Sequence, residues 1–438
     1  MINCDLIIYN ANQLATCAAG GKPKRRAAMQ DIGLIENGAV AVKNGVIIAV
    51  GKSDEILRGY KAENVIDAKD RTVTPGFVEC HTHIVYAGNR LNEFELKIKG
   101  ADYLEILESG GGIISTVRQT REAGLAELVE ESAKRLDKML ALGVTTCEIK
   151  TGYGLDTVTE LRMLEAIFRL NDTHVIDLIP TFLPAHAIPP EFREKEKRRK
   201  GEKEKTNADF YIDLICEEML PQAAKIKDRS PKTKDQFFVD VFCEKNAFNL
   251  EQSRRVLTAA KNFGFKLKAH VDEFTNLGAA RMAIEIGATS IDHLDTISDE
   301  EIRLLADSET IGVVTPTVNF NFGSHEFADA RKLIDAGCAV AVSTDYNPGS
   351  APCPSLPAAM AIACRYQKLL PSEALNAVTI NAAFAVNSGE KIGSLEVGKQ
   401  ADILIADTKD YRQIAYEFGG NLINTVIKNG EVVFSQKD

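Results

Sequence analysis

Short apolar runs alternate with amphipathic stretches through the middle of the chain, from about residue 71 to residue 389. Eight runs rich in Val, Ile, Leu and Phe have the length of buried strands, and they span residues 77–80, 144–150, 175–183, 237–242, 266–270, 290–293, 311–315 and 339–344. Between several of them apolar residues recur every three or four positions. This spacing predicts helices, for example at residues 125–142, 158–170, 250–263 and 277–286.

Strands that alternate with helices form parallel sheets, because the chain must return across one face before the next strand begins. Eight such units predict a closed (β/α)8 barrel, a TIM-like α/β fold. In these barrels the functional side chains lie at the carboxyl ends of the strands. The polar residues that follow each predicted strand are therefore the candidates for chemistry.

Both ends of the chain show short strands and tight turns instead. Predicted strands cover residues 6–9, 39–42, 46–50 and 65–67 near the start, and 402–406 and 424–434 near the end. The dipeptides Asn44-Gly45 and Asn429-Gly430 are typical of two-residue hairpin turns. Neither end has enough strands for a stable unit alone. Residues 1–70 and 390–438 are therefore predicted to form one small β-sandwich domain, with the barrel inserted at residues 71–389.

Composition and charge argue against several classes of function. The 438-residue chain has a net charge of −10, whereas nucleic-acid binders depend on clustered positive charge. No apolar run is long enough to span a bilayer, and the N-terminus lacks the pattern of a signal peptide. Nine cysteines occur without CxxC pairs, as expected for free thiols in a reducing cytosol. We expect a cytoplasmic protein in which the charged residues 193–205 form a solvated surface insertion.

Histidines gather where the predicted strands end. His81 and His83 follow the first strand at i and i+2, so both leave it on the same side. Three more histidines and an aspartate follow other strands, namely His186, His270, His293 and Asp345. A lone histidine is more often a core residue than a ligand, but five of the seven histidines on one rim predict a metal site.

Three imidazoles and a carboxylate suit a transition metal such as zinc or iron, with room for a water molecule. The metal lowers the pKa of that water and so makes a nucleophile for hydrolysis. Glu273, three residues after His270, is close enough to carry a proton from the water to a leaving nitrogen. Asp345 can bind the metal and accept the first proton, and His293 can orient the water or polarise the scissile carbonyl.

These ligand positions resemble the amidohydrolase superfamily, and longer segments resemble the imidazolonepropionase family within it. The segments are residues 75–92, 93–99, 110–121 (GGGIISTVRQTR), 148–155, 181–187, 268–274 and 343–350 (STDYNPGS). The resemblance covers nearly the whole chain. It implies hydrolytic opening of 4-imidazolone-5-propanoate to N-formimino-L-glutamate in histidine degradation, with one Zn²⁺ or Fe³⁺ ion per chain.

The resemblance also implies a role for individual residues. It makes His81, His83, His270 and Asp345 the metal ligands, and Glu273, His293 and Asp345 the catalytic residues. The implied substrate contacts are Arg90, Tyr103, Tyr153, His186, Glu273, Asn347, Gly349 and Ser350. An arginine suits the propanoate because it can bind a carboxylate through two hydrogen bonds. The turn at residues 347–350 is expected to offer backbone N–H groups to the same carboxylate or to the ring.

Two other functions are compatible with parts of this pattern. Another hydrolase or deaminase of cyclic amides or aromatic bases would share the metal site, but its substrate would have no acidic tail for Arg90. A catalytically inactive relative that serves as an assembly protein would have lost ligands that are present here. Lys150 at a strand end would bridge two metals if it were carbamylated. The superfamily has that lysine on the fourth strand, and here the fourth strand ends at Cys243, which favours one metal.

Two residues depart from the family pattern, Cys80 before the first histidine and Pro184 in the third strand. Both leave the metal set intact, but Pro184 could alter how His186 is presented. The expected partner is a small-molecule substrate with a carboxylate tail, and we expect neither nucleic acid nor membrane as a partner. The expected assembly is a homodimer, the commonest homo-oligomer.

Overall fold

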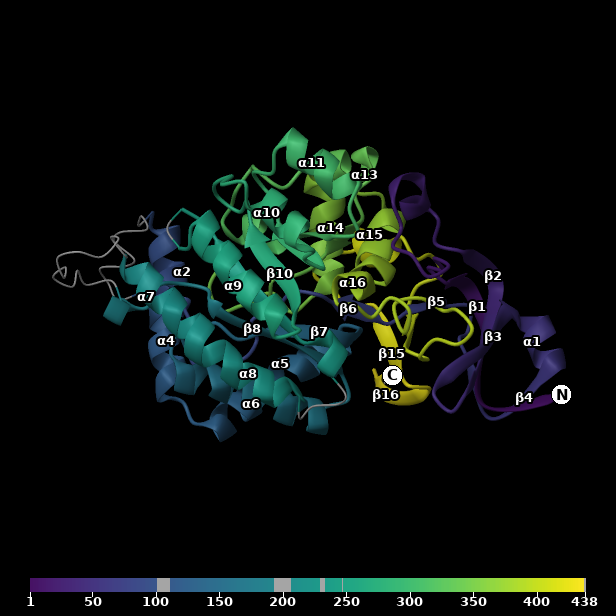
Figure 1. Ribbon diagram of the computed structural model, residues 1–438. Coiled ribbons are helices and arrows are strands. Elements are labelled where there is room, and N and C mark those ends of the chain that lie inside the picture. Colours follow the sequence, from purple (N-terminus) through teal and green to yellow (C-terminus); the bar gives the residue numbers. More distant parts are fainter. Residues whose placement is uncertain (101–110, 193–205, 229–232, 246, 437–438) are drawn as a thin grey trace, which may run out of the picture.

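A computed structural model describes residues 1–100, 111–192, 206–228, 233–245 and 247–436. The charged insertion expected at residues 193–205 lies outside the described residues. Figure 1 shows a larger part in which helices surround a sheet, and a smaller part in which strands from both ends of the chain lie side by side.

The larger part contains eight parallel strands in the order β13-β12-β11-β10-β9-β8-β7-β6. Their bounds are β6 Phe77–Glu79, β7 Val144–Lys150, β8 Asp177–Ala185, β9 Phe238–Cys243, β10 Lys266–Val271, β11 Ser290–His293, β12 Ile311–Val314 and β13 Val340–Val342. All eight predicted strands are present, so the predicted barrel is confirmed. Just beyond the strands, Thr82 forms a parallel bridge with Tyr346, and the His83 N–H donates to the Tyr346 carbonyl at 2.9 Å. These contacts join the first strand to the last.

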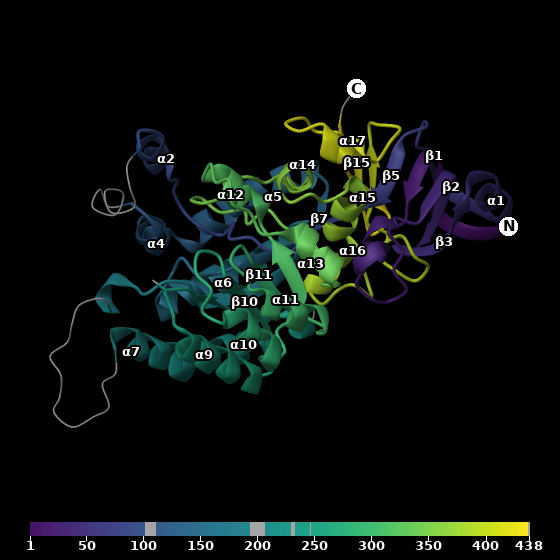
Figure 2. The same cartoon turned by 90° about the horizontal axis from the view of Figure 1, so that it is seen from above.

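Helices follow the strands and lie around the outside of this sheet (Figures 1 and 2). Their bounds are α2 Leu91–Ile98, α4 Ile113–Glu122, α5 Leu125–Ala141, α6 Thr157–Thr173, α7 Asn207–Leu214, α8 Leu220–Asp228, α9 Leu250–Asn262, α10 Ala279–Ile286, α11 Asp299–Ala306, α12 Pro316–Asn321, α13 Ala330–Ala336, α14 Leu356–Tyr366, α15 Pro371–Ala377, α16 Ile380–Ala385 and α17 Gln413–Tyr416. Helix α5 shows why the pattern predicted them, since Leu128, Leu136 and Met139 recur on one buried face. Within the part of the chain that the structure describes, no helix is long and apolar enough to cross a membrane.

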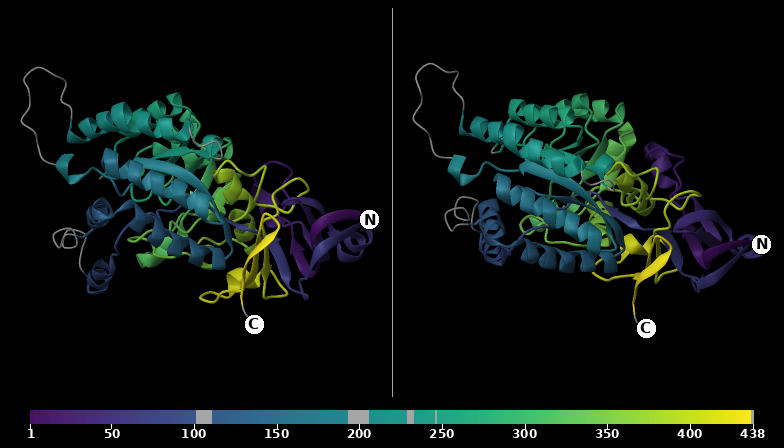
Figure 3. Two further views of the ribbon diagram at one scale, coloured as in Figure 1. Left: turned by 90° about the horizontal axis from the view of Figure 1, so that it is seen from below. Right: turned by 60° about the horizontal axis from the view of Figure 1, so that its bottom comes forward.

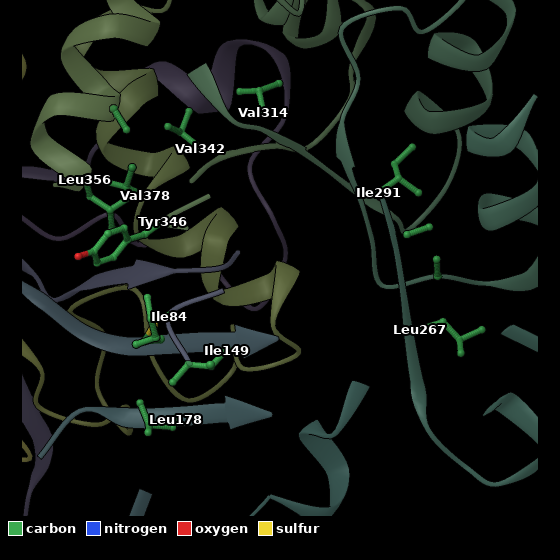
Figure 4. Packing of buried hydrophobic residues seen from close by; sticks show 14 of the residues in the cluster. Ile84, Ile149, Leu178, Leu267, Ile291, Val314, Val342, Tyr346, Leu356 and Val378 are labelled. Atoms are coloured by element: carbon green, nitrogen blue, oxygen red, sulfur yellow. The ribbon is translucent and has the colours of Figure 1, made fainter. Parts of the chain in front are cut away.

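Side chains of the barrel strands alternate between two apolar layers. Ile149 of β7 and Leu267 of β10 belong to the large cluster between strands and helices, part of which appears in Figure 4. Val78 and Val313 belong to a separate cluster that includes residues of α16. This alternation follows from the two-residue period of a strand. It also leaves inward positions near the carboxyl ends for polar side chains.

The smaller part is one sheet built from both chain ends (Figures 1 and 3). Its strands are β1 Ile2–Ala15, β2 Leu34–Lys43, β3 Val46–Lys52, β4 Tyr60–Asp67, β5 Thr72–Pro75, β14 Ile403–Ala406, β15 Ile423–Lys428 and β16 Glu431–Ser435, with helix α1 at Ser53–Gly59. The Asn44-Gly45 and Asn429-Gly430 turns both have two positive φ angles, as the hairpin prediction requires. The domain bounds 1–70 and 390–438 stay a prediction.

Candidate metal centre and active-site cavity

The four predicted metal ligands converge at the carboxyl ends of the barrel strands. His81 and His83 follow β6, His270 is the penultimate residue of β10, and Asp345 follows β13. The Nε2 atom of His83 lies 3.3 Å from that of His81 and 3.4 Å from that of His270. The Oδ1 atom of Asp345 lies 3.4 Å from Nε2 of both His81 and His83. The ligand atoms of His81, His83 and Asp345 therefore lie close around one point, and His270 adjoins this group through His83.

These separations fit a divalent cation. Ligand bonds of about 2.0–2.1 Å in tetrahedral geometry put neighbouring ligand atoms about 3.3–3.4 Å apart. The Asp345 Oδ1 atom is buried, and no described residue donates a hydrogen bond to it. Burial raises the pKa of Asp345 well above its usual value, so a cation beside the carboxylate would stabilise its charged form. Burial also lowers the pKa values of His81 and His83 well below normal, which keeps these imidazoles neutral and able to bind a metal.

Two buried carboxylates orient the ligand histidines from behind. The Oδ2 atom of Asp292 lies 2.6 Å from Nδ1 of His81, and Oδ2 of Asp240 lies 3.1 Å from Nδ1 of His270. The contact with Asp292 favours the His81 tautomer with the proton on Nδ1, which leaves Nε2 free for a metal. Asp240 is close enough to attract a proton on Nδ1 of His270, but this nitrogen makes no hydrogen bond within the described part of the chain. The ammonium of Lys150 lies 2.8 Å from Asp240 Oδ2 and 3.7 Å from Asp292 Oδ2. One cation therefore compensates both carboxylates.

The surroundings of Lys150 argue against the dinuclear alternative. Its ammonium also lies 2.8 Å from Oε1 of Glu148 and is fully buried. Burial opposes its charge, but Asp240 and Glu148 outweigh burial and raise the pKa of Lys150 above its normal value. A carbamate forms only on a neutral amine, so this ion cluster disfavours a bridging role. Neither Asp240 nor Asp292 was predicted. Asp240 had a signal, a charged residue inside an otherwise apolar strand, whereas Asp292 lies in the short polar run Ser290–His293 and had none.

Glu273 and His293 face the same space. Glu273 follows β10, and its Oε2 atom lies 4.0 Å from Nε2 of His293. Burial and the neighbouring Asp345 raise the pKa of Glu273 well above normal, which suits a group that must both take up and release a proton. The Nδ1 atom of His293 lies 3.1 Å from the Thr315 hydroxyl, and its Nε2 has no hydrogen-bond partner among the described residues. The backbone of His293 has a φ of 86°, a strained value of the kind often found at functional sites.

A cavity of about 440 Å³ opens beside these residues. It is lined by seven of the predicted substrate contacts, namely Arg90, Tyr153, His186, Glu273, Asn347, Gly349 and Ser350. Tyr103, the eighth, lies outside the described residues. Other lining residues were not predicted, including Glu93, Gly112, Phe242, Phe274 and Phe322. Glu93, Gly112 and Phe274 lie in segments that carry the family resemblance, but no residue type or spacing there marked them as cavity residues, and only the fold brings the five together.

His186 is presented to the cavity despite the proline before it. Its ring stacks on that of His83 with centroids 4.9 Å apart, and its Nδ1 lies 3.0 Å from the Gly152 carbonyl. An Nδ1–H donor there leaves Nε2 as an acceptor. Burial, with His270 nearby, lowers the pKa of His186 to about 3, so the ring is neutral. Pro184 lies near a shift of register in β8, and its carbonyl accepts the Tyr211 hydroxyl at 2.9 Å.

The turn at residues 347–350 differs from the expectation. Its backbone N–H groups at Gly349 and Ser350 both donate to the Asn347 side-chain oxygen at 2.8 Å, so they are not offered to a ligand. The Asn347 amide in turn donates to the Asp345 carbonyl and to the Ser350 hydroxyl, both at 2.7 Å. Asn347 therefore fixes the shape of a turn that begins at a predicted metal ligand.

Comparison with known proteins extends this description. The chain matches the amidohydrolase family over residues 72–433. It is 50% identical over 436 residues to the imidazolonepropionase of Chloroflexus aggregans, with 99% of each chain covered. It is 47% identical over 433 residues to that of Herpetosiphon aurantiacus, with 99% of this chain and 98% of the relative covered. A zinc-bound adenosine deaminase from Xanthomonas campestris has a similar fold, with a TM-score of 0.72, 20% identity, and 99% and 94% of the two chains covered.

Proposed function

The chain belongs to the imidazolonepropionases of the amidohydrolase family, and from this membership we propose how its residues carry out the reaction. The enzyme hydrolyses the cyclic amide C–N bond of 4-imidazolone-5-propanoate and gives N-formimino-L-glutamate, a step of histidine degradation. One observation carries the assignment of residues. A single cavity is lined by His83, His270 and Asp345 of the predicted ligand set and by Arg90, which matches a substrate with a scissile amide and a carboxylate tail.

His81, His83, His270 and Asp345 would hold one zinc or iron ion. When bound, the ion supplies Lewis acidity and lowers the pKa of a water molecule toward neutrality. Asp292 and Asp240 keep the ring nitrogens of His81 and His270 pointed at this position. The tight separations of 3.3–3.4 Å between ligand atoms support this set.

Glu273 is the proton carrier of the reaction. Its carboxylate accepts a proton as the water oxygen bonds to the ring carbonyl carbon, and it returns that proton to the ring nitrogen when the C–N bond breaks. The pKa raised by burial and by Asp345 favours the protonated form that the second half of the reaction needs. His293, with its Nδ1 beside the Thr315 hydroxyl, directs Nε2 to the scissile carbonyl.

The remaining cavity residues bind and orient the substrate. Arg90 pairs with the propanoate, and Tyr153 and the neutral His186 form hydrogen bonds to the ring. Asn347 and the turn that it braces shape the wall beside Arg90. Two wider properties belong to the same proposal: the enzyme is a homodimer, the commonest closed oligomer, and it works in the cytoplasm.

The test is a spectrophotometric assay with freshly made 4-imidazolone-5-propanoate. Purified protein should remove the imidazolone absorbance rapidly, should contain about one metal ion per chain, and should lose activity on chelation and regain it when the metal is restored. Adenosine serves as a comparison substrate without an acidic tail and should not be turned over. A metal-loaded protein that leaves imidazolonepropanoate unchanged would refute the proposal.

A further inference from the structure

The guanidinium of Arg90 is paired inside the cavity with a neighbouring carboxylate. Arg90 precedes helix α2, and Glu93 lies in the first turn of that helix. The Oε2 atom of Glu93 lies 2.8 Å from Nε and 2.6 Å from Nη2 of Arg90. The side chains of Arg90 and Glu93 are only 15% and 7% exposed, and both line the cavity. This pair is thus part of the cavity wall and not a surface ion pair.

The second oxygen of Glu93 is also used. Oε1 accepts the backbone N–H of Gly112 at 2.9 Å, and Gly112 immediately precedes helix α4. Glu93 therefore joins Arg90 to the start of a second helix, and both carboxylate oxygens are fixed. An arginine tied on one side in this way loses much of its rotational freedom before any ligand arrives.

The opposite side of the guanidinium is enclosed by Gly349. A Cβ atom on Gly349 would lie 2.0 Å from Nη1 and 2.6 Å from Cζ of Arg90, so only glycine leaves room for this rotamer. Glu93 uses the Nε and Nη2 groups, and among the described residues no hydrogen bond involves Nη1, which we assign to the ligand. A guanidinium has five N–H donors in a rigid fork, so it can bind Glu93 and a second carboxylate together.

We propose that Glu93 is a positioning residue that holds Arg90 as the carboxylate receptor of the cavity and so determines specificity for substrates with an acidic tail. The inference rests on the proposed function, because the acidic tail is that of imidazolonepropanoate. The negative charge of Glu93 would also repel such a tail. The charge of Glu93 is already compensated by the guanidinium, which contacts its Oε2 atom at 2.6–2.8 Å, and no comparable contact joins Glu93 to the tail. The positioning effect therefore outweighs the repulsion.

Binding by the metal-loaded protein tests this inference without relying on turnover. The probes are 3-(imidazol-4-yl)propanoate and its neutral primary amide, measured by titration calorimetry. Glu93→Gln keeps an acceptor for the Gly112 N–H but removes the charge that holds Arg90. It should weaken binding of the acid about tenfold and leave the amide unchanged. In kinetics with imidazolonepropanoate, KM should rise by a similar factor with kcat little changed.

A double-mutant cycle with Arg90→Ala separates positioning from a general structural role. In the Arg90→Ala background, Glu93→Gln should cause no further loss of acid binding, because the residue acts through the arginine. The matched control is Glu95→Gln in the same helix, where Glu95 pairs with Lys99 and both side chains are about two-thirds exposed. This control should bind both probes like the unmodified protein.

Several results would overturn the inference. They are unchanged or tighter binding of the acid by Glu93→Gln, equal weakening for acid and amide, the same loss in the Arg90→Ala background, or no binding of the acid by the unmodified protein. Failure of the proposed reaction is a separate result. If the unmodified protein binds the acid but does not hydrolyse imidazolonepropanoate, the reaction is refuted and the binding cycle still decides the role of Glu93.

Discussion

Replacing Asp292 with asparagine tests the carboxylates behind the metal ligands. Asp292 Oδ2 lies 2.6 Å from Nδ1 of His81, and its Oδ1 accepts the Ser290 hydroxyl at 2.7 Å. An asparagine can turn its amide oxygen to His81, so the hydrogen bond survives without its charge. Lys150 keeps its two partners at 2.8 Å, so the fold should persist. The substitution therefore removes mainly the charge that holds the His81 tautomer.

The expected loss is a tenfold to hundredfold decrease in metal affinity, which corresponds to about 1.4–2.7 kcal/mol. The upper part of this range is favoured because the bond is short, charged and fully buried, and charged hydrogen bonds are about twice as strong as neutral ones. Asp240→Asn should weaken the metal less through His270, where the distance is 3.1 Å. Its effect on folding should be larger, because Asp240 pairs directly with Lys150 at 2.8 Å.

The assay is competition for Zn²⁺ between the apoprotein and a chromogenic chelator of known affinity, with melting curves of the apoproteins measured in parallel. Glu373→Gln is the matched control, because Glu373 is another fully buried carboxylate in an ion pair, with Arg331 at 2.7 Å. This control should lose stability but keep its zinc affinity. If Asp292→Asn binds zinc as tightly as the unmodified protein, the carboxylate does not set the state of His81 and the reasoning is refuted.

Three further predictions concern the cavity. Glu273→Gln should keep the metal and lose about 10²–10⁴-fold in kcat, since proton transfer is removed; metal analysis and steady-state kinetics check this, and a fully active variant would exclude Glu273 from the mechanism. Gly349→Ala should raise KM about tenfold, because its Cβ would displace Arg90; an unchanged KM would show that Arg90 does not hold the carboxylate. The pKa of His186 is lowered to about 3 in the folded protein, whereas it is about 6.5 in the unfolded chain. Between these two values the unfolded chain binds a proton that the folded protein does not, so the free energy of unfolding decreases as the pH is lowered. In denaturant titrations, His186→Asn should reduce the slope of the free energy of unfolding against pH in this range by about 1.4 kcal/mol per pH unit. The same slope in the variant and the unmodified protein would contradict a buried neutral ring.

The pattern of apolar residues predicted the strands of the barrel because it can be read within a short segment of the chain. Strands of the barrel bury side chains on both faces, so a run such as that from Phe238 to Cys243 is apolar enough to stand out in the sequence. Strands near the N-terminus were predicted too short. β1 runs from Ile2 to Ala15 and pairs with β2, β4 and β5, and the polar residues on either side of its apolar segment at 6–9 hide its length. Helix α1 was not predicted because one short amphipathic segment has no distinct signal.

The sequence by itself determined which residues could bind a metal. Position at a strand end is encoded locally, and the closed sheet brings all strand ends to one rim, so His81, His270 and Asp345 could be grouped without coordinates. Only the tertiary structure showed which charged residues contact these predicted ligands and one another. Asp292 meets His81 across 211 residues of chain, and Lys150 meets Asp240 across 90. Such pairings depend on the stagger of strands around the barrel and on the burial that makes an unpaired charge costly. No local pattern carries that information.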